Sequence, residues 1–108
     1  MDMQNLQAVI NAVKKVIPLR EAYLFGSYAY GVPNKDSDYD LYFVADKIDA
    51  RKHDVIVSIY DVIDDIRKKP IDVLLNTKEH FDSRKDYRGT IEYKVVKEGV
   101  RLYEQRNV

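Results

Sequence analysis

The spacing of apolar residues along the chain predicts three helices of moderate length. In residues 3–17 apolar side chains recur every three or four positions, the period of an amphipathic helix, and Pro18 marks its end. The same period over residues 51–69 predicts a second helix with one apolar side. Residues 91–97 are a third helical segment, and Gly99 behind them is typical of a C-terminal cap.

Short apolar runs between these segments predict strands. Residues 22–25 and 40–44 combine aliphatic and aromatic side chains over four or five positions, and residues 71–75 are mostly aliphatic. Residues 100–103 form a further short extended segment. Residues 27–30 are expected to form one helical turn, because glycine and proline follow at once.

Helices and strands in this order indicate an α/β (α+β) domain with a small mixed sheet of three to four strands and helices packed on it. Thr77 is expected to cap one more short helix after the third strand. A length of 108 residues suits a single domain, residues 1–108. Strands joined by a helix normally run parallel, so residues 40–44 and 71–75 should begin at the same edge of the sheet.

Composition narrows the class of protein. Eighteen basic residues balance eighteen acidic ones, whereas nucleic-acid-binding proteins usually carry a basic excess, so nucleic acid is not the expected partner. No apolar run approaches the roughly 18 residues of a membrane span, and the N-terminus lacks a signal-peptide pattern. The chain contains no cysteine, which excludes disulfides and thiolate metal sites. We therefore expect a cytoplasmic protein without a membrane partner.

Three aspartates stand at the start of predicted strands. Asp38 and Asp40 point to the same face of extended backbone, with Cα atoms roughly 7 Å apart, and Asp72 begins the neighbouring strand. Carboxylates this close repel one another unless a cation neutralises them. Mg²⁺, or Mn²⁺ as an alternative, suits such oxygen ligands, and two ions would clamp the attacking and leaving oxygens of a phosphoryl displacement.

Gly26 and Ser27 lie at the same edge if the first two strands are antiparallel. A glycine allows close approach of a phosphate, and the N–H groups of the following turn with the Ser27 hydroxyl would hold its oxygens. A phosphate cradle beside a divalent metal site is suited to splitting a nucleoside triphosphate. A Walker loop is excluded because Val32 and Pro33 replace its Lys and Ser/Thr. An EF-hand starting at Asp36 is excluded because Leu41 replaces its glycine.

The sequence GSYAYG at 26–31, followed by SDYDL at 37–41, resembles the nucleotidyltransferase superfamily that includes DNA polymerase beta. It resembles more closely the minimal nucleotidyltransferase (MNT) antitoxins encoded with HEPN toxins, whose signature reads Gly-Ser-x-Ala-Arg-Gly, then Ser-Asp-x-Asp-Leu. The segment KEGVRLYE at 97–104 also resembles the end of such domains.

The resemblance implies transfer of AMP from ATP to a tyrosine hydroxyl of a partner HEPN toxin, with pyrophosphate leaving. It further implies that Asp38 and Asp40 hold both metal ions and that Gly26 and Ser27 hold the outer phosphates. Asp72 would complete the metal site and act as general base. Tyr30 stands where the family usually has arginine, so a fixed positive charge is missing there.

Two other functions stay open at this point. One is an antitoxin that neutralises its toxin by binding, with little or no turnover. The other is a small-molecule nucleotidyltransferase of the antibiotic-modifying type, and a homo-oligomer is compatible with either. The tyrosines near the motif, which are expected to stack on a base or contact a partner, are Tyr28, Tyr30 and Tyr39. The tyrosines expected to pack in or beside the core are Tyr23, Tyr42 and Tyr60.

Overall fold

The computed structural model describes residues 2–33 and 37–106, which form four strands and five helices. The elements in chain order are α1 (Met3–Val13), β1 (Leu19–Phe25), α2 (Ser27–Tyr30), β2 (Tyr39–Ala45), α3 (Lys52–Ile63), β3 (Ile71–Thr77), α4 (Lys78–Arg84), α5 (Ile91–Glu98) and β4 (Val100–Glu104). The sheet has the strand order β3-β2-β1-β4. This architecture confirms the predicted α/β class and mixed sheet.

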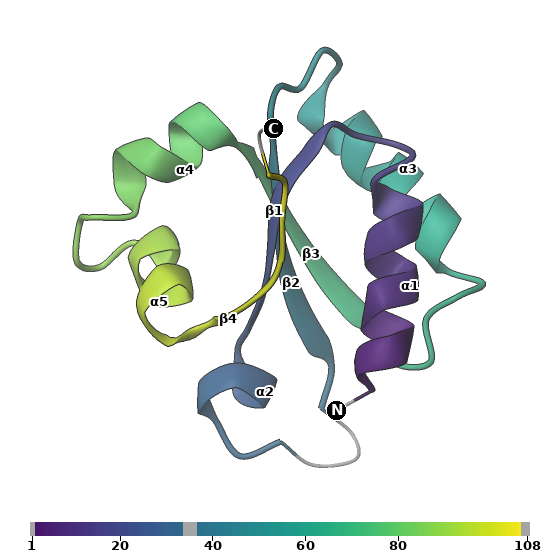
Figure 1. Ribbon diagram of the computed structural model, residues 1–108, viewed down its shortest axis with the longest axis horizontal. Coiled ribbons are helices and arrows are strands. Elements are labelled where there is room, and N and C mark those ends of the chain that lie inside the picture. The colour runs from purple at the N-terminus through teal and green to yellow at the C-terminus, as the bar shows by residue number, and fades with distance from the viewer. Residues whose placement is uncertain (1, 34–36, 107–108) are drawn as a thin grey trace.

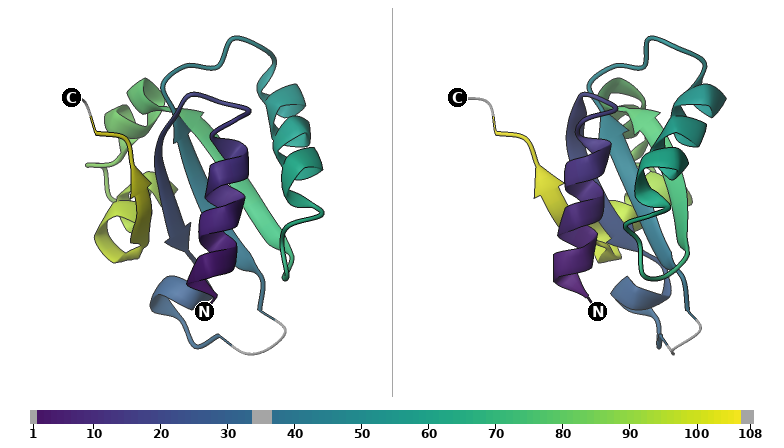
Figure 2. Two further views of the ribbon diagram at one scale, coloured as in Figure 1. Left: turned by 45° about the vertical axis from the view of Figure 1, so that its right-hand side comes forward. Right: turned by 90° about the vertical axis from the view of Figure 1, so that its right-hand side faces the viewer.

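Helices cover both faces of the sheet. Figure 1 shows α1 and α3 on one side, α4 and α5 on the other, and the short α2 at one end. Two further views keep the same three layers (Figure 2). The alternation of strand side chains between faces produces two apolar clusters, a larger one under α1 and α3 and a smaller one under α4 and α5.

The strand pairing brings distant segments together at the end of the sheet next to α2. β1 and β2 are antiparallel, as are β1 and β4, whereas β2 and β3 are parallel with α3 as their crossover. The segment predicted as a short extended tail is the strand β4, which hydrogen-bonds to β1. The C-terminal end of β1 and the N-terminal ends of β2 and β3 therefore share one edge.

Two helices are shorter than their apolar period predicted. α1 ends at Val13 because the next residues form tighter turns: Lys15 and Val16 donate backbone hydrogen bonds to carbonyls three residues earlier. α3 ends at Ile63, where the chain turns to meet α1. The buried amide of Asn5 donates to the Ile66 carbonyl at 2.8 Å and accepts from the Lys68 N–H at 3.1 Å. This tertiary contact diverts the chain before Pro70, and periodicity alone cannot reveal it.

Within the described residues, no helix is both long and apolar enough to cross a membrane. The predicted caps are present: the Thr77 hydroxyl accepts a hydrogen bond from the His80 N–H, and Gly99 ends α5. α4 thus begins directly at the end of β3, and α5 leads directly into β4. These short connections hold both helices against the face that carries the smaller cluster.

Candidate active site

Three neighbouring strands align at the edge beside α2. Phe25, the last residue of β1, is the register partner of Asp40 on β2, and Asp40 is the partner of Asp72 on β3. Tyr39 and Leu41 belong to the larger cluster, so Asp40 between them points to the opposite face, as Asp72 does between Ile71 and Val73. Asp40 and Asp72 therefore lie side by side on the α4/α5 face.

Asp38 precedes β2 by one residue and is exposed. Its charge still reaches Asp40 and contributes to the raised pKa of that residue. Among the residues that the structure describes, no three Asp, Glu, His or Cys side chains are already arranged to hold a metal ion. The fold itself brings Asp40 and Asp72 together, and Asp38 lies beside them in the loop that enters β2.

The environment of Asp40 raises its pKa above the ordinary range for aspartate. Partial burial is the largest cause, because it disfavours the charged form. The neighbouring charge of Asp72, a hydrogen bond shared with Asp72, and the charge of Asp38 act in the same direction. The cluster thus concentrates negative charge that a cation would relieve.

Gly26 connects β1 to α2 in a conformation that favours glycine. Its φ of 73° lies in the left-handed region, and a Cβ there would come within 3.0 Å of Asp40 Cγ. The Gly26 carbonyl accepts hydrogen bonds from Ala29 and Tyr30 in the first turn of α2. The missing side chain therefore lets the backbone of the turn lie directly against a carboxylate.

Ser27 is the first residue of α2 and is partly exposed. Gly31 ends this single turn, and a Cβ at Gly31 would approach the Ser27 Cα to 2.9 Å, so the turn is closed tightly on itself. The structure thus places the predicted pair, Gly26 and Ser27, at the same edge as Asp40 and Asp72. Asp36, the first acid of the excluded EF-hand alternative, lies outside the described residues.

The tyrosines of this region have different roles from those expected. Tyr39 is only 2% exposed, packs its ring 4.6 Å from that of Tyr28 (between centroids), and accepts a hydrogen bond from the Asp2 N–H. The expectation that Tyr39 is available to a base or partner is wrong, because the strand parity turns it into the larger cluster. The core prediction for the other three is confirmed: Tyr23 and Tyr42 are buried, and Tyr60 packs against the larger cluster.

Sequence reasoning missed two lysines at α2. Lys94 on α5 places its Nζ 4.7 Å from the centroid of the Tyr30 ring, and Lys69 places its Nζ 5.7 Å from that of Tyr28. Both distances are within the range of cation–π attraction. The only signal in the sequence is the uncharged stretch 26–31, which does not indicate which lysine approaches it.

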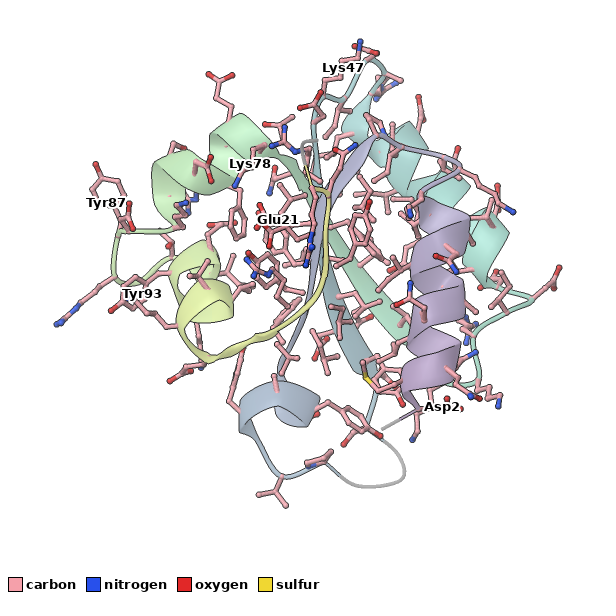
Figure 3. The ribbon with its side chains drawn as sticks, viewed as in Figure 1. Asp2, Glu21, Lys47, Lys78, Tyr87 and Tyr93 are labelled. Carbon is pink, nitrogen blue, oxygen red and sulfur yellow. The ribbon has the colours of Figure 1, made fainter. Side chains whose placement is uncertain are left out.

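Two buried carboxylates support the same face of the sheet. Glu92 on α5 is 2% exposed, and its oxygens accept hydrogen bonds from the Tyr42 hydroxyl at 2.7 Å and from Arg84 Nε at 2.8 Å. Glu21 on β1 accepts from Lys78 Nζ at 2.7 Å, and Figure 3 shows the two side chains pointing toward one another. These satisfied ion pairs fix α4 and α5 on the sheet next to the acidic cluster.

The residues at the edge fit a hard divalent cation. Carboxylate oxygens are the ligands that Mg²⁺ and Mn²⁺ prefer, and the raised pKa of Asp40 reflects repulsion that such a cation would remove. Asp40 and Asp72 would hold it from neighbouring strands, and Asp38 is the nearest further carboxylate along the chain. The fit rests on donor chemistry and on the closeness of two of these acids.

Solved structures with this fold include nucleotidyltransferases and antitoxins. A nucleotidyltransferase structure from Sulfolobus solfataricus superposes with a TM-score of 0.64 at 20% identity, covering 95% of this chain and 80% of that one. A toxin–antitoxin complex with AMP-PNP gives 0.59 at 19% identity, with 98% and 76% coverage. The Shewanella oneidensis complex of a tri-AMPylated HEPN toxin with its MNT antitoxin gives 0.59 at 20% identity, with 97% and 74% coverage.

These likenesses, all below 25% identity, establish the fold. A comparison with curated protein sequences finds no match. The sequence itself matches the family described as "Polymerase beta, Nucleotidyltransferase" over residues 7–107, which include every strand and the whole candidate site. The chain therefore belongs to the polymerase beta nucleotidyltransferase family.

Proposed function

We propose that this protein is a Mg²⁺-dependent nucleotidyltransferase that transfers AMP from ATP to a hydroxyl group of a partner protein. The observation that carries the proposal is the register of Asp40 and Asp72, which puts two carboxylates side by side against the Gly26 turn. We further propose that the partner is a HEPN toxin and the protein its antitoxin. The structural likeness to the MNT antitoxin that is bound to a tri-AMPylated HEPN toxin supports this choice.

The proposed reaction is an in-line displacement at the α-phosphorus of ATP. The acceptor hydroxyl forms the new P–O bond, the bond to the β-phosphate oxygen breaks, and pyrophosphate leaves. Asp38, Asp40 and Asp72 would hold Mg²⁺, two ions in the two-metal arrangement, which supplies charge neutralisation for the attacking and leaving oxygens. Asp72, the more exposed member of the Asp40–Asp72 pair, would accept the proton of the acceptor hydroxyl.

The turn at the end of β1 would hold the outer phosphates. Gly26 brings the backbone close to Asp40, and the Ser27 hydroxyl and the first N–H groups of α2 would donate hydrogen bonds to the phosphate oxygens. Since the acceptor belongs to the partner, no second substrate-binding domain is needed in this chain. The nucleotide is bound at one side of the acidic pair, and the acceptor enters from the exposed side of Asp72.

The direct test uses ATP labelled at the α-phosphate, Mg²⁺, this protein and the product of the adjacent gene. We expect label on the partner, lost with Asp72→Asn and in the presence of EDTA. Asp61→Asn, a change on the exposed side of α3, is the matched control and should transfer label as the wild type does. An unlabelled partner, or equal labelling by Asp72→Asn, would contradict the proposal.

A binding-only antitoxin is the second candidate, because the described residues hold no group of three side chains already arranged for a metal. Such a protein would neutralise its toxin by occlusion. Calorimetry of the two proteins without ATP separates the candidates. Tight binding that is unchanged by the double variant Asp38→Asn/Asp40→Asn, with the toxin inhibited but unmodified, would favour occlusion over catalysis.

A further inference from the structure

The turn that is proposed to hold the phosphates carries no charge of its own. Residues 26–31 read GSYAYG, and the nearby side chains that the fold brings to this edge, Asp40 and Asp72, are acidic. A nucleoside triphosphate adds several negative charges to such a site. Backbone N–H groups and a serine hydroxyl supply only partial charges, so a fixed cation beside the turn would add to the neutralisation that the proposed Mg²⁺ ions supply and would favour the outer phosphates.

Lys94 lies on the side of α2 that belongs to the same face of the sheet as Asp40 and Asp72. Its Nζ lies 4.7 Å from the centroid of the Tyr30 ring, and Tyr30 packs against the smaller cluster, on the face that carries Asp40 and Asp72. Lys69, in contrast, lies over Tyr28, which packs against the larger cluster on the opposite face. Of these two lysines, only Lys94 thus shares a face with the acidic pair.

The position of Lys94 is set by packing as well as by the tyrosine. α5 lies on the same side of the sheet as α4, above α2 in Figure 1, and the contact of Lys94 with Tyr30 joins it to α2. The end of α5 is tightly apposed to β1, since a Cβ at Gly99 would come within 3.0 Å of the Leu24 carbonyl, two residues before Gly26. Tyr30 lies three residues after Ser27 in α2, a spacing that puts the two side chains on the same side of the helical turn. The ammonium group therefore lies over a ring that belongs to the same helical turn as Ser27.

We propose that Lys94, positioned by the ring of Tyr30, binds the β- and γ-phosphates of the nucleoside triphosphate. This inference rests on the proposed function. Tyr30 attracts the ammonium group through its ring face and keeps it near α2 before the nucleotide arrives. The incoming phosphate oxygens then accept charge-assisted hydrogen bonds from it. Tyr30 is a positioning residue here, and Lys94 a binding residue.

The experiment measures the affinity of Mg²⁺–AMP-PNP and of AMP by calorimetry for matched variants. Lys94→Gln should weaken binding of the triphosphate analogue by about tenfold, the usual effect of losing one charged hydrogen bond, and should leave AMP binding unchanged. Lys97→Gln removes the same charge one turn later, where the lysine lies over Tyr93 on its own helix, and should change neither affinity by more than about twofold. Lys94→Arg should retain most of the affinity.

Variants of Tyr30 test the positioning role. Tyr30→Phe keeps the ring and should bind the triphosphate analogue as the wild type does, whereas Tyr30→Ala should weaken it in the same direction as Lys94→Gln. Lys94 is exposed, so its variants should unfold at the wild-type temperature without nucleotide.

The outcomes separate this inference from the proposed function. A Lys94→Gln protein that binds the triphosphate analogue normally, while the wild type binds it in a metal-dependent way, overturns the role of Lys94 alone. An equal loss of AMP and triphosphate affinity also overturns it, because a phosphate-binding lysine should not affect AMP. A wild type that binds no nucleotide at all overturns both proposals.

Discussion

Asp40 on β2 and Asp72 on β3 are register partners on parallel strands, and the nearby carboxyl group of Asp72 helps to raise the pKa of Asp40. The pairing places two acids side by side at the end of the sheet, where both strands begin. Such an arrangement opposes folding at neutral pH in the absence of a cation. The repulsion between the two carboxylates should therefore lower the free energy of unfolding by a measurable amount, and the first two predictions concern this effect.

Asp40→Asn should make the metal-free protein more stable at pH 7. The pKa of Asp40 is raised in the folded state, so ionisation favours unfolding, and stability falls as the pH rises through the folded pKa. Below the unfolded value of about 3.9, wild type and variant should converge. Urea denaturation in EDTA across this pH range measures the difference, and a variant less stable than the wild type at pH 7 would contradict it.

Mg²⁺ should stabilise the wild type and not the variants Asp40→Asn or Asp72→Asn. A ligand that binds only the folded state at 100 times its Kd adds about 2.7 kcal/mol to the free energy of unfolding. The thermal unfolding midpoint should therefore rise with Mg²⁺ or Mn²⁺ and fall again with EDTA. Asp61 lies on α3 and is not part of the acidic pair, so Asp61→Asn should respond to Mg²⁺ as the wild type does. If Mg²⁺ raised the unfolding midpoint of Asp72→Asn as much as that of the wild type, Asp72 would not be a ligand of the metal ion.

Gly26→Ala should destabilise the protein more than Gly89→Ala does. Both glycines have a positive φ, of 73° and 92°, so each alanine carries a backbone cost of about 1–3 kcal/mol. At Gly26 the new methyl group also collides with the Asp40 carboxyl group, whereas at Gly89 nothing lies within 4 Å.

Chemical denaturation of both variants, and of Gly26→Ala in an Asp40→Ala background, isolates the collision. The extra cost at Gly26 should shrink when the Asp40 carboxyl group is absent. Equal losses for the two glycine variants would show that the turn relaxes away from Asp40. If the turn holds the phosphates, Gly26→Ala should also lower nucleotide transfer, whichever stability result is found.

Tyr42→Phe should cost about 1.5–3 kcal/mol, because it removes a buried hydrogen bond to a charged group. Burial opposes ionisation of Glu92, but the hydrogen bonds from Tyr42 and Arg84 outweigh it and lower the pKa of Glu92. The stabilisation is complete above the unfolded pKa of about 4.3 and is lost as the pH falls through the folded value.

The difference between wild type and Tyr42→Phe should therefore be largest above about pH 4.3 and shrink in acid. Urea midpoints at several pH values measure it. Tyr87→Phe is the control, since Tyr87 is 67% exposed and points away from the sheet (Figure 3). A pH-independent difference would mean that the Tyr42 hydroxyl supports packing and has no influence on the ionisation of Glu92.

Apolar periodicity predicted most of the elements but misjudged where two helices end. The periods of residues 3–17 and 51–69 continue beyond Val13 and Ile63 because the following side chains still face the core. The helices stop earlier for reasons of tertiary structure, above all the buried amide of Asn5, which binds the backbone at Ile66 and Lys68. A hydrogen bond across 61 residues leaves no periodic signal in the sequence.

The roles of the tyrosines also depend on long-range contacts that the local sequence does not reveal. Tyr28, Tyr30 and Tyr39 are all near the motif in sequence, but strand parity buries Tyr39 and leaves the other two partly exposed. Lys94 reaches Tyr30 from a helix more than sixty residues later, so only the packing of α5 on β1 reveals it. Local patterns predict which residues are chemically suited to a site, and long-range packing determines which of them meet.

The sequence by itself determined the fold class and the parallel pairing of the second and third strands, and it singled out the candidate residues Gly26, Ser27, Asp38, Asp40 and Asp72, because strand alternation and turn chemistry are local properties of the chain. Only the tertiary structure decided that Asp40 and Asp72 share a register, that Gly26 lies against Asp40, and that a lysine from α5 lies over α2. Those contacts depend on how two apolar clusters pack on opposite faces of one sheet, and that packing is a property of the whole chain.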